Sequence, residues 1–150
     1  MIPDSSSAPI LVLGATTACG QFLLDRLKDQ GVRLLAVSRK PPDHAEPHVL
    51  WLEQDLDQGA VSLEANVVIS TGPLIHAIRQ LDATPRVGRI VAISSASTEF
   101  KAQSDDLQER ALIKGLIDQE EQLQARCRQR GVALTLLKPT MIYGGHRNAN

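Results

Sequence analysis

The sequence predicts an α/β fold built on a doubly wound parallel sheet of about six strands, with helices on both faces. Three observations support this. The stretch Ile10–Leu27 reads as a strand, a tight glycine-bearing turn and a helix. Short apolar runs, such as VVI at 67–69 and IVAI at 90–93, alternate with segments of helical periodicity. These runs are continuous, which is typical of strands buried on both faces of a parallel sheet.

Strands and helices are expected to alternate along almost the whole chain. The expected strands are Ile10–Leu13, Arg33–Ser38, Val49–Leu52, Asn66–Ser70, Arg89–Ser94 and Ala133–Leu137. The expected helices are Gly20–Gln30, Pro73–Ala83 and Asp105–Arg130, the first and last of them followed by Gly31 and Gly131 as C-terminal caps. Three prolines within 40–47 make a long helix between the second and third strands unfavourable. Right-handed crossovers then give the strand order 3-2-1-4-5-6.

Length and composition indicate one globular domain and exclude several classes of function. The chain has 150 residues, of which 43% are hydrophobic and 22% charged, and a net charge of −1. This charge and the 3% aromatic content argue against nucleic-acid binding. No apolar run reaches the ~18 residues that a membrane span needs. Residues 1–8 are expected to be a disordered lead, and 9–150 the domain.

Cysteine and histidine usage favours a reduced, cytoplasmic setting without a metal. Cys19 and Cys127 are too few for a disulfide framework or a zinc site. The four histidines lack metal-ligand spacing, so no metal site is expected. The first residues have neither the basic nor the apolar region of a signal peptide.

The turn after the first strand is where a sheet of this kind binds the phosphates of a dinucleotide. Gly14 would allow the sharp turn, and Gly20 would let the helix pack closely. The N–H groups at the helix start would stabilise an anion. A third glycine of the usual fingerprint is absent, so a turn that binds nothing is the alternative. The candidate cofactor residues here are Gly14, Thr16, Thr17, Ala18, Cys19 and Gly20.

The second and third strands add candidates, because ligands of such sheets bind at the carboxyl ends of strands. Ser38, Arg39 and Lys40 end the second strand, and this basic pair suits a 2′-phosphate, which favours NADP over NAD. A solvated basic pair is the alternative. Asp55 and Leu56 follow the third strand, where the carboxylate could face an adenine amino group or cap the next turn.

The fourth and fifth strands also end in polar residues. The fourth ends in Ser70, Thr71, Gly72 and Pro73, in which the glycine allows close approach of a ligand and the proline suits the first turn of a helix. Ser94 and Ser95 begin a hydroxyl cluster after the fifth strand. These hydroxyls could hold a substrate carbonyl or hydroxyl, or they could only cap the following helix.

Taken in order, these motifs resemble the short-chain dehydrogenase/reductase superfamily, in its extended and atypical NAD(P)-dependent epimerase/dehydratase branch. The matching pieces are LVLGATTACG (11–20), DL (55–56), ISTGP (69–73), IVAISSAST (90–98) and LKPTMIYGG (137–145). The resemblance implies a Rossmann fold, NADP or NAD as cofactor, and hydride chemistry on an alcohol, a carbonyl or a nucleotide-sugar. It places Ser94 or Ser95 in the region of the family's catalytic serine or threonine.

The chain departs from this family at the Tyr-x3-Lys pair. The helix expected at 105–130 has no tyrosine, and Lys114 is its only lysine. Arg110, four residues earlier, cannot replace a phenol as acid or base because a guanidinium does not lose its proton. The candidate catalytic residues are therefore Ser94, Ser95 and Lys114. The alternative to an NADP-linked oxidoreductase is a catalytically silent dinucleotide-binding sensor or scaffold.

Three expectations concern the last third of the chain. Glu120 falls on the apolar stripe of the last helix, and N–H groups of a loop are its expected partners. Arg126 and Arg130 are expected on a solvated outer face. The sequence ends seven residues after Tyr143, so the chain is expected to lack the substrate-binding part of extended family members. The sequence does not identify a particular substrate. An open edge at the sixth strand favours a homodimer.

Overall fold

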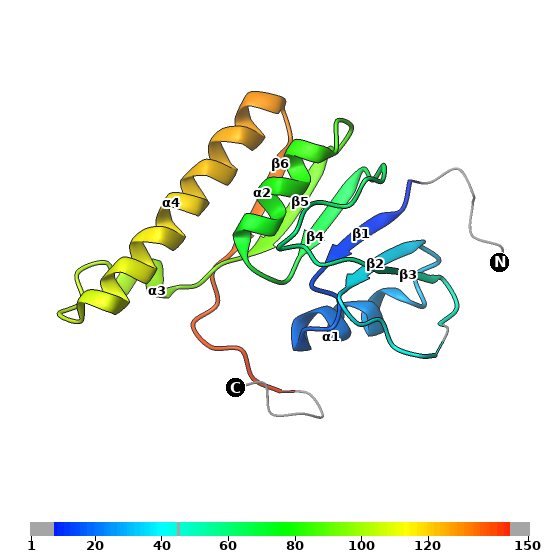
Figure 1. Ribbon diagram of the computed structural model, residues 1–150, viewed down its shortest axis with the longest axis horizontal. Helices are drawn as coiled ribbons and strands as arrows, with labels where there is room; N and C mark the ends of the chain where they lie inside the picture. The colour runs from blue at the N-terminus through cyan, green and yellow to red at the C-terminus, as the bar shows by residue number, and fades with distance from the viewer. Residues whose placement is uncertain (1–7, 45, 145–150) are drawn as a thin grey trace.

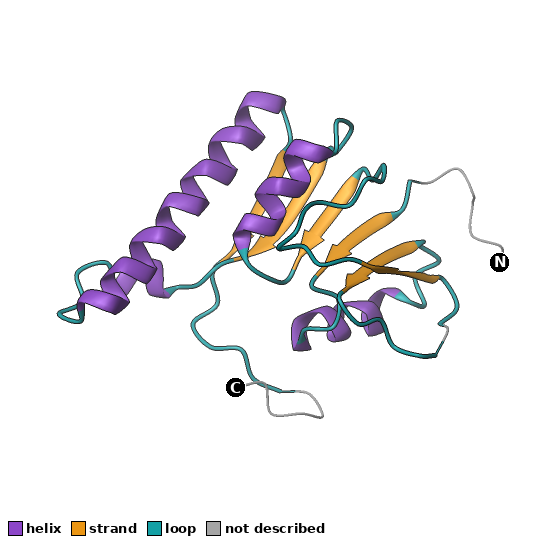
Figure 2. Cartoon of the chain, in the orientation of Figure 1, coloured by secondary structure: helices purple, strands orange, loops and turns teal. Residues whose placement is uncertain are grey.

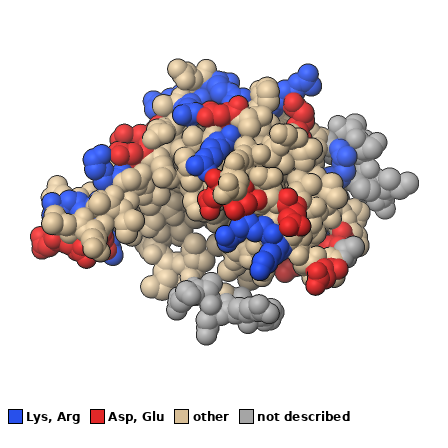
Figure 3. Space-filling view, in the orientation of Figure 1, with Lys and Arg blue, Asp and Glu red and all other residues tan. Residues whose placement is uncertain are grey.

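The computed structural model describes residues 8–44 and 46–144, which form a parallel sheet with helices on both faces (Figure 1, Figure 2). Apart from Ala8, the expected disordered lead lies outside the described residues. Acidic and basic side chains are interspersed over the face shown in Figure 3. No described helix is both long enough and apolar enough to cross a membrane.

The sheet confirms the predicted fold class and strand order. Its order is β3-β2-β1-β4-β5-β6, and every neighbouring pair is parallel. The central strand β1 pairs with β2 and β4, so that Leu11 lies between Leu35 and Val68. The strands are β1 (Ile10–Leu13), β2 (Leu34–Ser38), β3 (Val49–Glu53), β4 (Val67–Ser70), β5 (Arg89–Ile93) and β6 (Ala133–Leu137).

The helices follow the prediction with shifted ends. They are α1 (Ala18–Leu27), α2 (Leu74–Ala83), α3 (Ser97–Phe100) and α4 (Leu107–Arg130). The last helix begins later than expected because Asp106 caps it, accepting from the N–H groups of Gln108 and Glu109. Gly131 adopts φ 67° as its C-terminal cap, as predicted. Helix α1 ends at Leu27, so Gly31, at φ 68°, lies beyond the helix instead of capping it.

Two apolar layers enclose the sheet because its strands alternate side chains between the faces. Leu11, Leu13, Val68 and Ile90 pack on the face covered by α2 and α4. Val12, Leu34 and Ala36 pack on the opposite face with Leu24 of α1. Both faces of each central strand are buried in this way, which is why the sequences of these strands are continuously apolar.

Two arginines join the C-terminal ends of α4 and α2, and the expectation that they are only solvated is wrong. The guanidinium of Arg130 donates to the carbonyls of Leu81, Thr84 and Pro85. Arg126 forms an ion pair with Asp82. The last carbonyls of a helix lack intrahelical partners, and the pairing of α4 with α2 brings these guanidinium groups to them. The sequence of α4 alone contains no sign of this neighbour.

Candidate functional site

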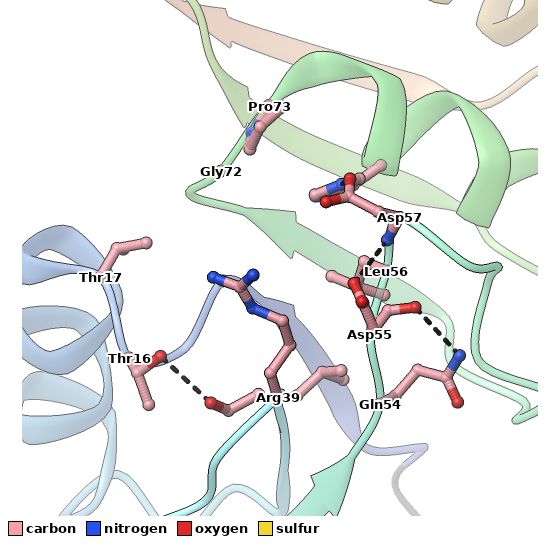
Figure 4. Close-up of a pocket in the computed structure, with 13 residues that line it drawn as sticks. Thr16, Thr17, Arg39, Gln54, Asp55, Leu56, Asp57, Gly72 and Pro73 are labelled. Atoms are coloured by element: carbon pink, nitrogen blue, oxygen red, sulfur yellow. Dashed lines mark hydrogen bonds and ion pairs between the residues drawn. The ribbon is translucent and has the colours of Figure 1, made fainter.

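The carboxyl ends of β1, β2, β3 and β4 surround a pocket of about 250 Å³ (Figure 4). Thirteen residues line it. Nine of them are predicted cofactor residues, namely Gly14, Thr16, Thr17, Ser38, Arg39, Asp55, Leu56, Gly72 and Pro73. The structure therefore gathers residues from four separate stretches of sequence at one edge of the sheet, where ligands of doubly wound folds bind.

The turn from β1 into α1 requires glycine at its first position. Gly14 has φ +71°, a conformation that costs residues with a Cβ atom free energy. A Cβ atom there would also lie 3.0 Å from the Thr71 hydroxyl oxygen. That hydroxyl donates to the Gly14 carbonyl at 2.8 Å, which ties the turn to the end of β4. The walls contributed by β1 and β4 are thus fixed relative to each other.

Thr17 caps α1 with its side-chain hydroxyl. Its oxygen accepts from the N–H of Gly20 at 3.0 Å and lies 2.9 Å from the hydroxyl oxygen of Thr71. Because the Thr71 hydroxyl already donates to Gly14, the Thr17 hydroxyl donates to Thr71. The hydroxyl proton of Thr17 is therefore already used in a hydrogen bond within the protein. The N–H groups of Ala18 and Cys19, at the start of the helix, are the ones placed for an anion.

Gly20 lies against the backbone of the turn. A Cβ atom at this position would lie 2.4 Å from the carbonyl oxygen of Gly14 and 2.7 Å from that of Ala15. Both distances are below van der Waals contact, so only glycine lets α1 start this close to the end of β1. The expected close packing is present, and it sets the distance between the helix N-terminus and the pocket.

The two basic residues after β2, Arg39 and Lys40, line different pockets. Arg39 points into the pocket between the wall that carries Thr17 and the wall that carries Asp57 (Figure 4). Lys40 instead lines a second pocket together with Trp51 and residues of α1. Ser38 fixes this junction, since its hydroxyl accepts from the Lys40 N–H and lies 3.1 Å from the hydroxyl oxygen of Thr16.

The wall opposite Arg39 is acidic. Asp55 accepts from the N–H of Asp57 at 3.0 Å, so it caps the turn after β3 and still lines the pocket. Asp57 Oδ1 lies 2.8 Å from Nε2 of His76 in α2. This hydrogen bond with His76, and then the charges of His76, Arg39 and Arg79, lower the pKa of Asp57 below its ordinary value. Asp57 is therefore ionised at neutral pH beside the Arg39 guanidinium.

Four lining residues escaped prediction, namely Val37, Gln54, Asp57 and His76. Asp57 follows two residues after the predicted Asp55, and extending that segment by one turn would have included it. The histidines lack metal-ligand spacing, and that spacing gives no reason to place His76 at this pocket. The position of His76 three residues after Pro73 places it in the first turn of α2, which is the signal that could have identified it. The described residues contain no group of three side chains arranged to hold a metal ion.

Apart from Lys40, the remaining predicted cofactor residues adjoin the lining residues in sequence without lining the pocket themselves. Ala18, Cys19 and Gly20 form the first turn of α1. Thr71 braces the glycine turn, as described above. Ser70 is buried, and its hydroxyl has no hydrogen-bond partner among the described residues.

The predicted catalytic serine Ser94 lies at the end of β5 in a cluster of paired charges. Its hydroxyl donates to Oε1 of Glu120, which is 5% exposed. The other carboxylate oxygen of Glu120 lies 2.8 Å from Nζ of Lys138, and Lys138 also contacts Glu99 at 2.5 Å. The hydrogen bonds to Glu120 and Glu99 raise the pKa of Lys138 above its ordinary value. The partners of Glu120 are thus a hydroxyl and an ammonium group, and the expectation of loop N–H groups is wrong.

The other two predicted catalytic residues lie in different surroundings. The Ser95 hydroxyl accepts from the N–H of Ser97, the first residue of the short helix α3. Lys114 is 75% exposed in its side chain and pairs with Asp118 at 3.0 Å. Lys114 precedes Glu120 by six residues. On an α-helix this separation places Lys114 about a third of a turn around the axis from the face that contacts Ser94. The structure therefore does not bring Lys114 to either serine.

Comparisons with known proteins reveal a likeness in structure. No protein-family model matches the chain, and no curated protein matches its sequence. UDP-N-acetylglucosamine 4-epimerase from Bacillus cereus superposes with a TM-score of 0.69 at 16% identity, over 95% of this chain and 59% of that one. A short-chain dehydrogenase/reductase superfamily protein from Agrobacterium tumefaciens with bound NAD gives 0.68 at 18%, over 86% and 48%.

A third solved structure is MoeE5 in complex with UDP-glucose and NAD, with a TM-score of 0.65 at 21% identity, over 85% of this chain and 52% of that one. The chain thus spans about half the length of these proteins. Together with the strand order, these likenesses establish that the chain has the Rossmann-type fold seen in short-chain dehydrogenase/reductase and UDP-sugar epimerase structures.

Proposed function

We propose that the chain binds a nicotinamide dinucleotide in the pocket at the ends of β1–β4, and that it prefers NADP to NAD. The observation that carries the proposal is the convergence of the Gly14 turn, the N-terminus of α1 and the Arg39 guanidinium on one cavity. The bound NAD in two of the similar structures supports it. The tight approach of Gly20 to the turn also fits, because it brings the helix N-terminus to the cavity.

Each part of the ligand has a counterpart in the chain. The N–H groups of Ala18 and Cys19 would bind the pyrophosphate, since a helix N-terminus stabilises an anion. Leu56 and Asp55 line the side of the cavity on which the adenine would bind. Arg39 would pair with the 2′-phosphate and so distinguish NADP from NAD. When bound, the nicotinamide would supply a site for hydride transfer.

Titration calorimetry with NADP⁺ and NAD⁺ tests this proposal. We expect NADP⁺ to bind in the micromolar range. Arg39→Ala should weaken NADP⁺ by about 10- to 100-fold, the loss of one charge-assisted contact, and leave NAD⁺ within about threefold. Arg86→Ala is the matched control, because Arg86 is an exposed arginine before β5. Absence of binding for both nucleotides would refute the proposal. An equal loss for both in Arg39→Ala would refute the preference.

A second candidate function is NADP-linked oxidoreductase chemistry on an alcohol, a carbonyl or a nucleotide-sugar. It is favoured by the Ser94 hydroxyl, which lies at the end of β5 beside a lysine and a carboxylate. Oxidation of NADPH in the presence of small carbonyls and UDP-sugars would support it, provided that Ser94→Ala abolishes the activity. A catalytically silent sensor or scaffold predicts no turnover with any of them. The predicted homodimer is a separate proposal, for which sedimentation equilibrium is the direct test.

A further inference from the structure

We infer that this chain recognises only the adenosine-diphosphate half of the dinucleotide, so that 2′-phospho-ADP-ribose binds as tightly as NADP. The inference rests on the proposed function and specifies its ligand class. The recognised ligands would be adenosine phosphates with a ribose 2′-phosphate, whatever group the far end carries. Three features of the structure support it.

The first feature is the extent of the cavity. Every lining residue lies between Gly14 and His76, at the ends of β1–β4 or in the first turn of α2. Within the described part of the chain, β5, β6, α3 and α4 contribute nothing to it. Its volume of about 250 Å³ is below the ~300–1,000 Å³ typical of pockets that enclose a whole drug-sized ligand. Such a cavity fits part of a dinucleotide.

The second feature is the pairing of polar groups at the ends of β5 and β6. The N–H of Ser94 donates to Leu137 at 2.8 Å, and that of Ala96 to Pro139 at 3.0 Å. The Ser94 hydroxyl and the Lys138 ammonium both bind the buried carboxylate of Glu120. A nicotinamide ribose that took over these hydrogen bonds would have to displace groups that are already paired with one another. That exchange would leave a buried carboxylate without its partners, which is strongly unfavourable.

The third feature is the position of the side chains that could otherwise bind a nicotinamide ribose. Lys114 faces solvent and is paired with Asp118. Tyr143 is 86% exposed, and it belongs to the segment that leaves the sheet after β6 (Figure 1). Neither side chain lines the cavity. Neither of these two side chains is therefore placed to bind the nicotinamide end of a ligand in the cavity.

Calorimetry with fragments of the ligand tests the inference on the full 150-residue chain. The ligands are NADP⁺, 2′-phospho-ADP-ribose, ADP-ribose and nicotinamide mononucleotide. We expect 2′-phospho-ADP-ribose to bind within fivefold of NADP⁺ and nicotinamide mononucleotide not to bind at millimolar concentration. Arg39→Ala should weaken NADP⁺ and 2′-phospho-ADP-ribose by the same factor and leave ADP-ribose unchanged. Saturation-transfer NMR on NADP⁺ should then show the adenine protons and not those of the nicotinamide.

The possible outcomes separate this inference from the function on which it rests. If NADP⁺ binds more than fivefold tighter than 2′-phospho-ADP-ribose, the nicotinamide half is recognised and the inference is overturned, while the proposed function stands. Saturation transfer to the nicotinamide protons of NADP⁺ would likewise overturn the inference and leave the proposed function standing. If no ligand of the set binds, the proposed function itself fails. Equal affinities with saturation confined to the adenine protons support the inference.

Discussion

The hydroxyl of Ser94 donates a hydrogen bond to the buried carboxylate of Glu120 and so joins the end of β5 to the middle of α4. Lys138, just after β6, binds the other carboxylate oxygen. One carboxylate therefore connects a helix with the ends of two strands. A buried charge is tolerated only when it is paired, and both oxygens of Glu120 have a partner. The cluster accordingly has a structural role that can be tested apart from any catalysis.

Removal of this carboxylate should destabilise the protein. In Glu120→Ala the Lys138 ammonium and the Ser94 hydroxyl lose their common partner, so we expect the free energy of unfolding to fall by about 2–4 kcal/mol. Glu120→Gln keeps an acceptor of the same shape and should lose less. The control is Glu121→Ala, because Glu121 is exposed on the same helix and should change stability by less than about 0.5 kcal/mol. Urea denaturation provides the measurement, and equal values for the two alanine variants would contradict the structural role.

Stability at alkaline pH should depend on Lys138. Its pKa is raised in the folded protein above the ordinary value of 10.5, so its contribution is fully present below that pH. The contribution is lost as the pH rises through the folded-state pKa, because the ammonium then loses its charge. The urea midpoint of the wild type should therefore fall more steeply above pH 10.5 than that of Lys138→Met. Parallel curves for the two proteins would show that the ion pair contributes nothing to folding.

Two glycines in helices should respond to alanine in opposite directions. Gly20→Ala places a methyl group 2.4 Å from the Gly14 carbonyl oxygen, and the forced shift should lower the free energy of unfolding by about 1–3 kcal/mol. Gly115 in α4 has open space around its Cβ position. Gly115→Ala should stabilise the protein by about 0.5–1 kcal/mol, because alanine is the better helix former. Thermal unfolding distinguishes these outcomes. If both changes lowered the stability, the low helix propensity of glycine would not be what decides the effect of replacing Gly115.

A buried glutamine in α2 fixes the loop before β4. Gln80 is fully buried, and its amide accepts from the N–H of Val61 and donates to the Val61 carbonyl, each at 2.9 Å. In Gln80→Met both backbone groups of Val61 lose their partner, so stability should fall by about 2–4 kcal/mol. Gln122→Met changes an exposed position of α4 and should be nearly neutral. Hydrogen exchange adds an independent test, since the Val61 amide should lose protection only in the first variant.

The fold could be predicted from the sequence because its signals are local. Continuous apolar strands such as β4 and β5, and the glycine turn at Gly14, indicate a doubly wound sheet without knowledge of any tertiary contact. The short helix α3 was not predicted, because its four residues are too few to show a helical period. The start of α4 was misplaced by two residues because Asp105 and Asp106 are both acceptable caps, and only the structure distinguishes them.

The candidate site could be predicted only in part, since its remaining features depend on contacts across the fold. Strand ends are visible in sequence, and Gly14, Arg39 and Asp55 were identified in this way. The pair of Asp57 and His76 spans 19 residues and forms because the loop after β3 lies beside the first turn of α2. Of the two partners of Glu120, Ser94 precedes it by 26 residues and Lys138 follows beyond the end of α4 and β6, so no local pattern connects them. Residues whose roles come from tertiary pairing are therefore the ones that sequence analysis missed.

The two cysteines should differ in reactivity, and this difference provides a probe of the proposed phosphate site. Cys19 is partly exposed in the first turn of α1, whereas Cys127 is 2% exposed on the buried face of α4. Burial raises the pKa of the Cys127 thiol, so it stays protonated and unreactive near pH 8. A thiol reagent should therefore modify Cys19 first in the native protein, and Cys127 only after unfolding in urea.

The same experiment in the presence of NADP⁺ tests where the pyrophosphate binds. A phosphate bound to the N–H groups of Ala18 and Cys19 would lie over the start of α1, and it should slow modification of Cys19. The Arg39→Ala variant should need more NADP⁺ for equal protection, because it lacks the contact to the 2′-phosphate. The rate for Cys127 in urea, with and without NADP⁺, shows that the nucleotide does not affect the reagent. If saturating NADP⁺ left the Cys19 rate unchanged, the pyrophosphate would not bind at this helix N-terminus.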